Sequence, residues 1–131
     1  MADQFRADGI GRVGRYARTP NLDRLADEGV IFTNAFVNSA ECVPSRLSLA
    51  TGLYPHQFGV DKNLECTLNP AAPNWMRALL DAGYRTSFFG KSHLHPHKGD
   101  IRDRLHLMHS YGLQSVVETV GPRAAAHGKA I

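Results

Sequence analysis

The chain has little cysteine, no long apolar run and no dense stretch of basic residues. Its 131 residues contain only Cys42 and Cys66, too few for the disulfide framework of many small secreted domains. The two could pair, but the surroundings of Cys42 favour a free thiol. No window approaches the roughly 18 apolar residues of a membrane span. Residues 1–6 lack the apolar core of a signal peptide, so a cytoplasmic location is the default expectation.

The net charge of the chain is also small. Fifteen Lys and Arg residues stand against twelve Asp and Glu, which gives a net charge of +3 with neutral histidines. This mild excess suits anionic substrates, but without basic runs that carry interleaved aromatic residues it argues against nucleic acid as a partner. The remaining composition, 43% hydrophobic and 21% charged, is that of one ordinary globular domain.

Residues 19–29 predict a helix. Thr19 is a good N-cap, Pro20 suits the first helical position, and Gly29 suits the C-terminal cap. The apolar stripe expected to be buried consists of Leu22, Leu25 and Ala26.

A second helix is expected at residues 74–84, with Asn74 as its cap and Gly83 at its end. Its predicted buried side consists of Trp75, Met76, Leu79, Leu80 and Ala82. Residues 85–90 follow as a strand, and residues 30–37, rich in β-branched and aromatic side chains, predict another. This succession indicates an α/β fold with a mostly parallel sheet.

The stretch Cys42-Val43-Pro44-Ser45-Arg46 stands out chemically. Pro44 suits the first turn of a helix over residues 45–51, which Gly52 can end in the left-handed conformation. Cys42 would then lie at a helix N-terminus, where backbone N–H groups favour negative charge, and Arg46 would lie one turn along. A buried cysteine in front of an ordinary helix is the plainer interpretation.

The longer string Cys42-x-Pro44-Ser45-Arg46, with Leu49, Thr51 and Gly52 after it, resembles the signature of the type I sulfatases of the alkaline-phosphatase superfamily. Three further landmarks resemble the same family in order. They are Met1-Ala2-Asp3-Gln4, the helix of residues 19–29, and Gly90-Lys91-Ser92-His93. Many members have an aromatic residue where this chain has Ser92.

The resemblance implies a fold, a cofactor and a set of site residues. The fold would be part of an alkaline-phosphatase-like, mostly parallel sheet flanked by helices. Cys42 would be oxidised to formylglycine, the nucleophile, by a formylglycine-generating enzyme. Asp3, the modified Cys42 and, at most through its amide oxygen, Gln4 would bind Ca²⁺ (or Mg²⁺ or Mn²⁺).

The same resemblance implies a mechanism. Hydrated formylglycine would attack the sulfur of a small-molecule or carbohydrate sulfate monoester, and elimination would then regenerate the aldehyde. Arg46 and Lys91 would stabilise the developing charge, and His93 would contact the diol or the leaving group.

Residues 1–131 would then be an N-terminal fragment of a sulfatase catalytic domain. The fragment would lack the first strand and the C-terminal portion, which carries further metal ligands, and it would have little or no activity alone. Phosphonate or phosphate monoester hydrolases of the same superfamily and a non-catalytic truncated homologue are the alternatives.

A histidine at every second position, His93, His95 and His97, would share one face of a strand and could suggest zinc. Pro96 interrupts that geometry and no cysteine or carboxylate joins the set, so an exposed histidine-rich loop is the alternative that the residues favour.

Overall fold

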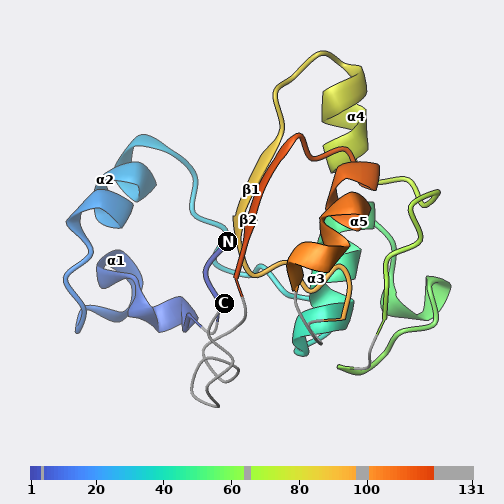
Figure 1. Cartoon of the computed structure of the whole chain (residues 1–131). Coiled ribbons are helices and arrows are strands. Elements are labelled where there is room, and N and C mark those ends of the chain that lie inside the picture. Colours follow the sequence, from blue (N-terminus) through green and yellow to red (C-terminus); the bar gives the residue numbers. More distant parts are fainter. Residues whose placement is uncertain (4, 64–65, 97–100, 120–131) are drawn as a thin grey trace. The chain divides into compact units, whose positions relative to one another are not determined.

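The computed structural model describes residues 1–3, 5–63, 66–96 and 101–119, shown as coloured ribbon in Figure 1. The chain divides into two compact units, Met1–Phe36 and Val37–Ile131, and each is described by itself. The first holds η1 (Ala7–Gly9), α1 (Gly11–Gly14) and α2 (Pro20–Glu28). The second holds α3 (Cys42–Thr51), η2 (Pro55–Gln57), α4 (Trp75–Asp81), β1 (Ser87–Gly90), η3 (Ile101–Arg104), α5 (Leu105–Ser110) and β2 (Ser115–Glu118).

Helix α2 begins and ends where the sequence predicted. Thr19 is its N-cap residue and Pro20 its first residue, but the Thr19 hydroxyl does not cap the helix. That hydroxyl instead accepts a hydrogen bond from the Gly11 amide at 2.7 Å and donates one to Asp23 at 3.0 Å. The predicted burial of the apolar stripe is wrong within this unit, because the short α1 leaves much of α2 uncovered and Leu25 is 67% exposed.

The predicted strand at residues 30–37 is wrong. The segment is irregular, with a turn at residues 33–34, and Phe32 and Phe36 are 79% and 89% exposed. A strand is stable only where a neighbouring strand pairs with its backbone N–H and C=O groups. The described residues place no strand beside this segment, so β-propensity alone does not make it one.

The second unit contains a pair of parallel strands, β1 and β2. Their register pairs Ser87 with Ser115 and Gly90 with Glu118. The chain between them passes through η3 and α5, and Figure 1 shows α3, α4 and α5 grouped on one side of the strands. The parallel pairing confirms an α/β arrangement, and the strand predicted at residues 85–90 is confirmed as β1.

The core of this unit lies among α3, α4, α5 and the segments that join them. Its buried apolar members are Val43, Leu47, Ala50, Val60, Leu68, Met76, Leu94, Met108, Tyr111 and Leu113. Helix α4 contributes Met76 alone, and Trp75 is 50% exposed, so most of the buried side predicted for this helix is wrong. The reason is that only a narrow side of α4 packs against the core. There Gly112 (φ +97°) lies so close to the α4 backbone that a Cβ on it would be 2.6 Å from the Cα of Arg77.

Candidate functional site

Cys42 is the first residue of α3. The helix starts three residues earlier than predicted, so Pro44 lies within its first turn, and Gly52 ends it in the left-handed conformation (φ 75°) as expected. Asn63 holds this end of the helix in place, because its side-chain oxygen accepts a hydrogen bond from the Val43 amide at 2.8 Å. The Asn63 amide in turn donates to the Glu41 carboxylate. Cys42 is half-buried, and its thiol is not in a disulfide.

Two basic side chains predicted for the site, those of Lys91 and Arg46, lie at or near Cys42. The Nζ atom of Lys91 lies 3.6 Å from the Sγ atom of Cys42, although 49 residues separate them in the chain. The Arg46 guanidinium, on the next turn of α3, is only 8% exposed and donates a hydrogen bond to the Lys91 carbonyl. The structure therefore brings Cys42, Arg46 and Lys91 together, while their roles in a reaction stay predictions.

His93 lies in the same loop as Lys91, two residues further on. Its backbone is in the left-handed region (φ 55°), uncommon for a residue other than glycine, and its side chain is half-buried. The loop is thus sharply bent at His93 and not a continuation of β1, which ends at Gly90.

The histidine-rich stretch is not the exposed loop that its residues favoured. His95 is 2% exposed, because its ring pairs with a carboxylate from β2, and His97 lies outside the described residues. Within the described part of the chain, no group of three or more His, Cys, Asp or Glu side chains is placed to bind a metal ion.

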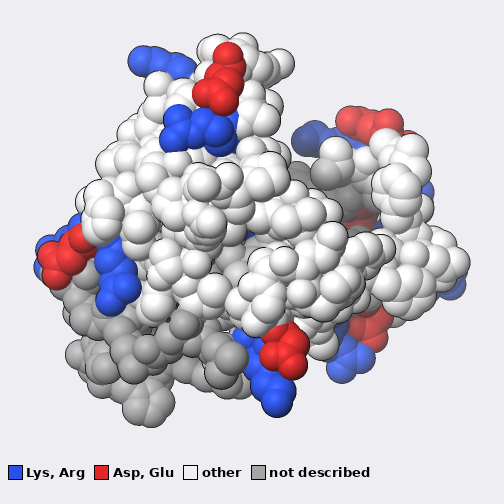
Figure 2. Space-filling model, turned by 90° about the vertical axis from the view of Figure 1, so that its right-hand side faces the viewer, with Lys and Arg blue, Asp and Glu red and all other residues white. Residues whose placement is uncertain are grey.

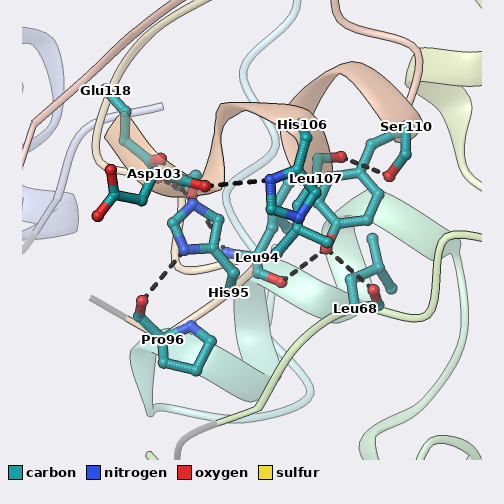
Figure 3. Close-up of polar contacts among 11 residues, drawn as sticks. Leu68, Leu94, His95, Pro96, Asp103, His106, Leu107, Ser110 and Glu118 are labelled. Carbon is teal, nitrogen blue, oxygen red and sulfur yellow. Dashed lines mark hydrogen bonds and ion pairs between the residues drawn. The ribbon is translucent and has the colours of Figure 1, made fainter. Parts of the chain in front are cut away.

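Glu118, the last residue of β2, is a site neighbour that the sequence did not reveal. Its carboxylate accepts a hydrogen bond from the Ser92 hydroxyl and lies 2.7 Å from Nε2 of His95. Figure 3 shows the His95 ring between Glu118 on one side and the Pro96 carbonyl on the other. Ser92, where the resemblance expected an aromatic side chain, is thus part of a buried polar network.

The predicted cation ligands lie in different parts of the chain. Asp3 is exposed in the first unit, Cys42 belongs to the second, and Gln4 lies outside the described residues. A hard cation such as Ca²⁺ takes about six to eight oxygen ligands, so Asp3 and Cys42 as formylglycine stay predicted members of a larger ligand set.

Charged side chains are spread over the surface. On the face that Figure 2 shows, basic and acidic side chains lie in small mixed groups separated by uncharged surface. Over the described residues, no helix combines the length and the apolar character needed to cross a membrane.

The comparisons with known proteins agree with the geometry around Cys42. The family model described as Sulfatase matches residues 1–124, nearly the whole chain. The chain belongs to the sulfatase family. An N-acetylgalactosamine-6-O-sulfatase of Bacteroides thetaiotaomicron is 42% identical over 94 residues, which are 66% of this chain and 18% of that protein. An ulvan-active sulfatase of Formosa agariphila is 40% identical over 100 residues, or 75% of this chain and 19% of that protein.

A solved structure carries the same likeness. The crystal structure of a protein assigned as a sulfatase, from Bacteroides fragilis, matches with a TM-score of 0.65 and 38% identity, over 73% of this chain and 23% of that one. This sulfatase chain therefore spans about a fifth of the length of the relatives it matches. The recognition from Cys42, Pro44 and Arg46 is confirmed, and the chain corresponds to the N-terminal part of longer sulfatases.

Proposed function

We propose that this chain is part of a sulfuric ester hydrolase that cleaves sulfate monoesters at Cys42. The observation that carries the proposal is the 3.6 Å approach of the Lys91 ammonium group to the Cys42 side chain, in a chain of the sulfatase family. An ammonium group beside a nucleophile stabilises the negative charge of a bound sulfate group and the negative charge that develops during the reaction.

Residues of this chain surround the position where that negative charge would lie. Cys42 begins a ten-residue helix, whose dipole favours an anion at that end. Lys91 provides a point charge, and Arg46 orients the Lys91 backbone while adding a second positive charge nearby. We propose that His93, two residues after Lys91 in the same loop, contacts the diol or the leaving group. The formylglycine that we propose at Cys42 would, when formed, supply a hydrated aldehyde as the nucleophile.

The substrate that we propose is a sulfated carbohydrate. One relative is named for a 6-O-sulfate of N-acetylgalactosamine and another for activity on ulvan. We infer that a divalent cation is also required, bound through Asp3 and through residues beyond those described here. The chain as it stands should therefore turn over sulfate esters slowly or not at all.

Mass spectrometry of the Cys42 peptide tests the proposal most directly. The chain would be produced together with a formylglycine-generating enzyme, and we expect Cys42 to change from CH₂SH to CHO. Cys66, the other cysteine of the chain, lacks the Pro and Arg at +2 and +4 and should stay a thiol, so it is an internal control. An unmodified Cys42, in cells where a known sulfatase is modified, would count against a formylglycine enzyme and for a non-catalytic homologue.

A second assay tests whether the chain alone is active and, if it is, on which class of ester. The modified chain, with Ca²⁺ added, would be given an aryl sulfate, an aryl phosphate and an aryl phosphonate. We expect negligible turnover of all three by the chain alone. Robust turnover of the sulfate would refute the incompleteness of the chain, and a preference for phosphate or phosphonate would refute the sulfatase assignment.

A further inference from the structure

A buried polar network lies directly beside the Lys91 loop, and the proposed reaction does not use it. The side chains of His95 and Glu118 are 0% and 1% exposed, and His95 Nε2 lies 2.7 Å from Glu118 Oε2. The other Glu118 oxygen accepts a hydrogen bond from the Ser92 hydroxyl, which itself accepts one from the Leu94 amide at 3.2 Å. One carboxylate thus holds two side chains of the same short loop.

The hydrogen-bonding pattern defines the protonation of this network. Nδ1 of His95 faces the Pro96 carbonyl at 3.1 Å, while Nε2 faces the Glu118 carboxylate. With Glu118 ionised, both oxygens are acceptors, so both contacts are hydrogen bonds when the ring carries two N–H groups and is an imidazolium. Burial lowers the pKa of His95, but the hydrogen bonds to Glu118 and Pro96 and the carboxylate charge outweigh burial and the Arg104 charge, so the net pKa is raised.

The position of Glu118 in the sheet explains how it reaches the loop. Glu118 is paired in register with Gly90, the last residue of β1, and the Thr119 amide extends the ladder by bonding to the Gly90 carbonyl at 3.0 Å. Lys91 follows Gly90 directly. The Glu118 carboxylate therefore lies at the end of the two strands from which the Lys91 loop departs, and β-sheet pairing fixes it there.

A buried ion pair is a poor way to gain stability, because desolvation of two charges offsets most of their attraction and apolar residues often do as well. Its directional hydrogen bonds do, however, fix the positions of the groups that make them. In this chain those groups flank His93 on both sides, and Lys91 precedes the first of them. The network is thus arranged to restrain the loop residues that approach Cys42.

We propose that Glu118 is a positioning residue, which through Ser92 and His95 holds the loop so that Lys91 stays beside Cys42. The inference rests on the proposed function only for the use that the Lys91 charge serves. The juxtaposition itself can be measured in the unmodified chain, without formylglycine and without turnover.

The test is cross-linking between Lys91 and Cys42 in the full chain with Cys66→Ser, which leaves one thiol. Difluorodinitrobenzene, a rigid reagent that joins an amine to a thiol across one aromatic ring, would be used, and the linked peptides would be quantified by mass spectrometry. We expect Glu118→Gln to lower the yield of the Lys91–Cys42 link about tenfold, because a charged hydrogen-bond acceptor is lost. Glu28→Gln, at an exposed position of α2, is the matched control and should leave the yield unchanged.

Ser92→Ala makes the proposal independent of whether Glu118→Gln folds. It removes one hydroxyl without changing the charge of the network, and we expect a smaller but clear fall in yield relative to Ser115→Ala, an exposed control in β2. Normal cross-linking in folded Glu118→Gln, or in Ser92→Ala when Glu118→Gln does not fold, would overturn the positioning role, even if either variant were less stable. Failure of Cys42 to become formylglycine would refute the proposed function and leave this result untouched.

Discussion

Substitution of Tyr111 by Phe tests how firmly the loop beside Cys42 is held by the core. Tyr111 is fully buried, and its hydroxyl donates to the Leu68 carbonyl at 2.9 Å, with the Leu94 carbonyl at 3.4 Å. The Leu94 carbonyl also accepts from the Leu68 amide at 2.7 Å, so it keeps a partner in the variant. The Leu68 carbonyl loses this donor in the core. Since the ring stays in place, no cavity opens, and we expect a loss of about 1–3 kcal/mol of unfolding free energy.

Urea unfolding followed by circular dichroism would measure this loss. With a slope of roughly 1–3 kcal/mol per molar urea, a loss of ~2 kcal/mol moves the midpoint by about 1 M. Tyr84→Phe is the matched control, because Tyr84 is 62% exposed and its hydroxyl should contribute less than about 0.5 kcal/mol. If the two variants unfold at the same urea concentration, the reasoning from the buried hydroxyl is refuted.

Three further predictions concern stability. Leu47→Ala should destabilise the chain by about 2–5 kcal/mol and Leu49→Ala by far less, because these neighbours on α3 are 1% and 56% exposed; equal urea midpoints would contradict the core assignment. Gly112→Ala should destabilise more than Gly83→Ala, since both have positive φ but only at Gly112 would a Cβ meet the α4 backbone; thermal melts that rank them oppositely would exclude that packing. The raised pKa of His95 means that its contribution is fully present below the ordinary value of 6.5 and is lost as pH rises through the folded value, so unfolding free energy measured from pH 6.5 upward should fall, and should not fall in His95→Gln.

Helices α2, α3 and α4 could be predicted from local signals, whereas burial could not. Pro44 lies in the first turn of α3 and Gly52 ends it, because backbone constraints act on the residues that carry them. Asn74 was expected to cap α4, and its side-chain oxygen does accept from the Arg77 amide at 2.9 Å. Which side of α4 is buried depends on partners elsewhere in the chain, so the prediction for Trp75 was wrong. The segment 30–37 fails as a strand for the same reason, since pairing is not a property of the segment itself.

The candidate site divides in a similar way. Cys42, Arg46 and Lys91 could be predicted because their motifs resemble a family, and the structure brings them together. Glu118 could not, because it lies 25 residues beyond His93 in a short strand, SVVE, whose composition carries no functional signal. Its role follows from the register of two parallel strands, which places Glu118 opposite Gly90. Non-local pairing of this kind leaves no trace in a single sequence.

Several contacts within the second unit hold the loop that carries Lys91. Arg46 holds its first backbone carbonyl, Glu118 holds Ser92 and His95, and Tyr111 approaches the carbonyl of Leu94. The residues that make these contacts belong to the second unit, whereas Asp3 lies in the first. The cation that we propose is bound through Asp3 and needs further oxygen ligands, which is a separate requirement from a Lys91 positioned beside Cys42. We therefore expect modification and turnover to be separable. Cys42 should become formylglycine beside a positioned Lys91, whereas hydrolysis of sulfate esters should require further cation ligands.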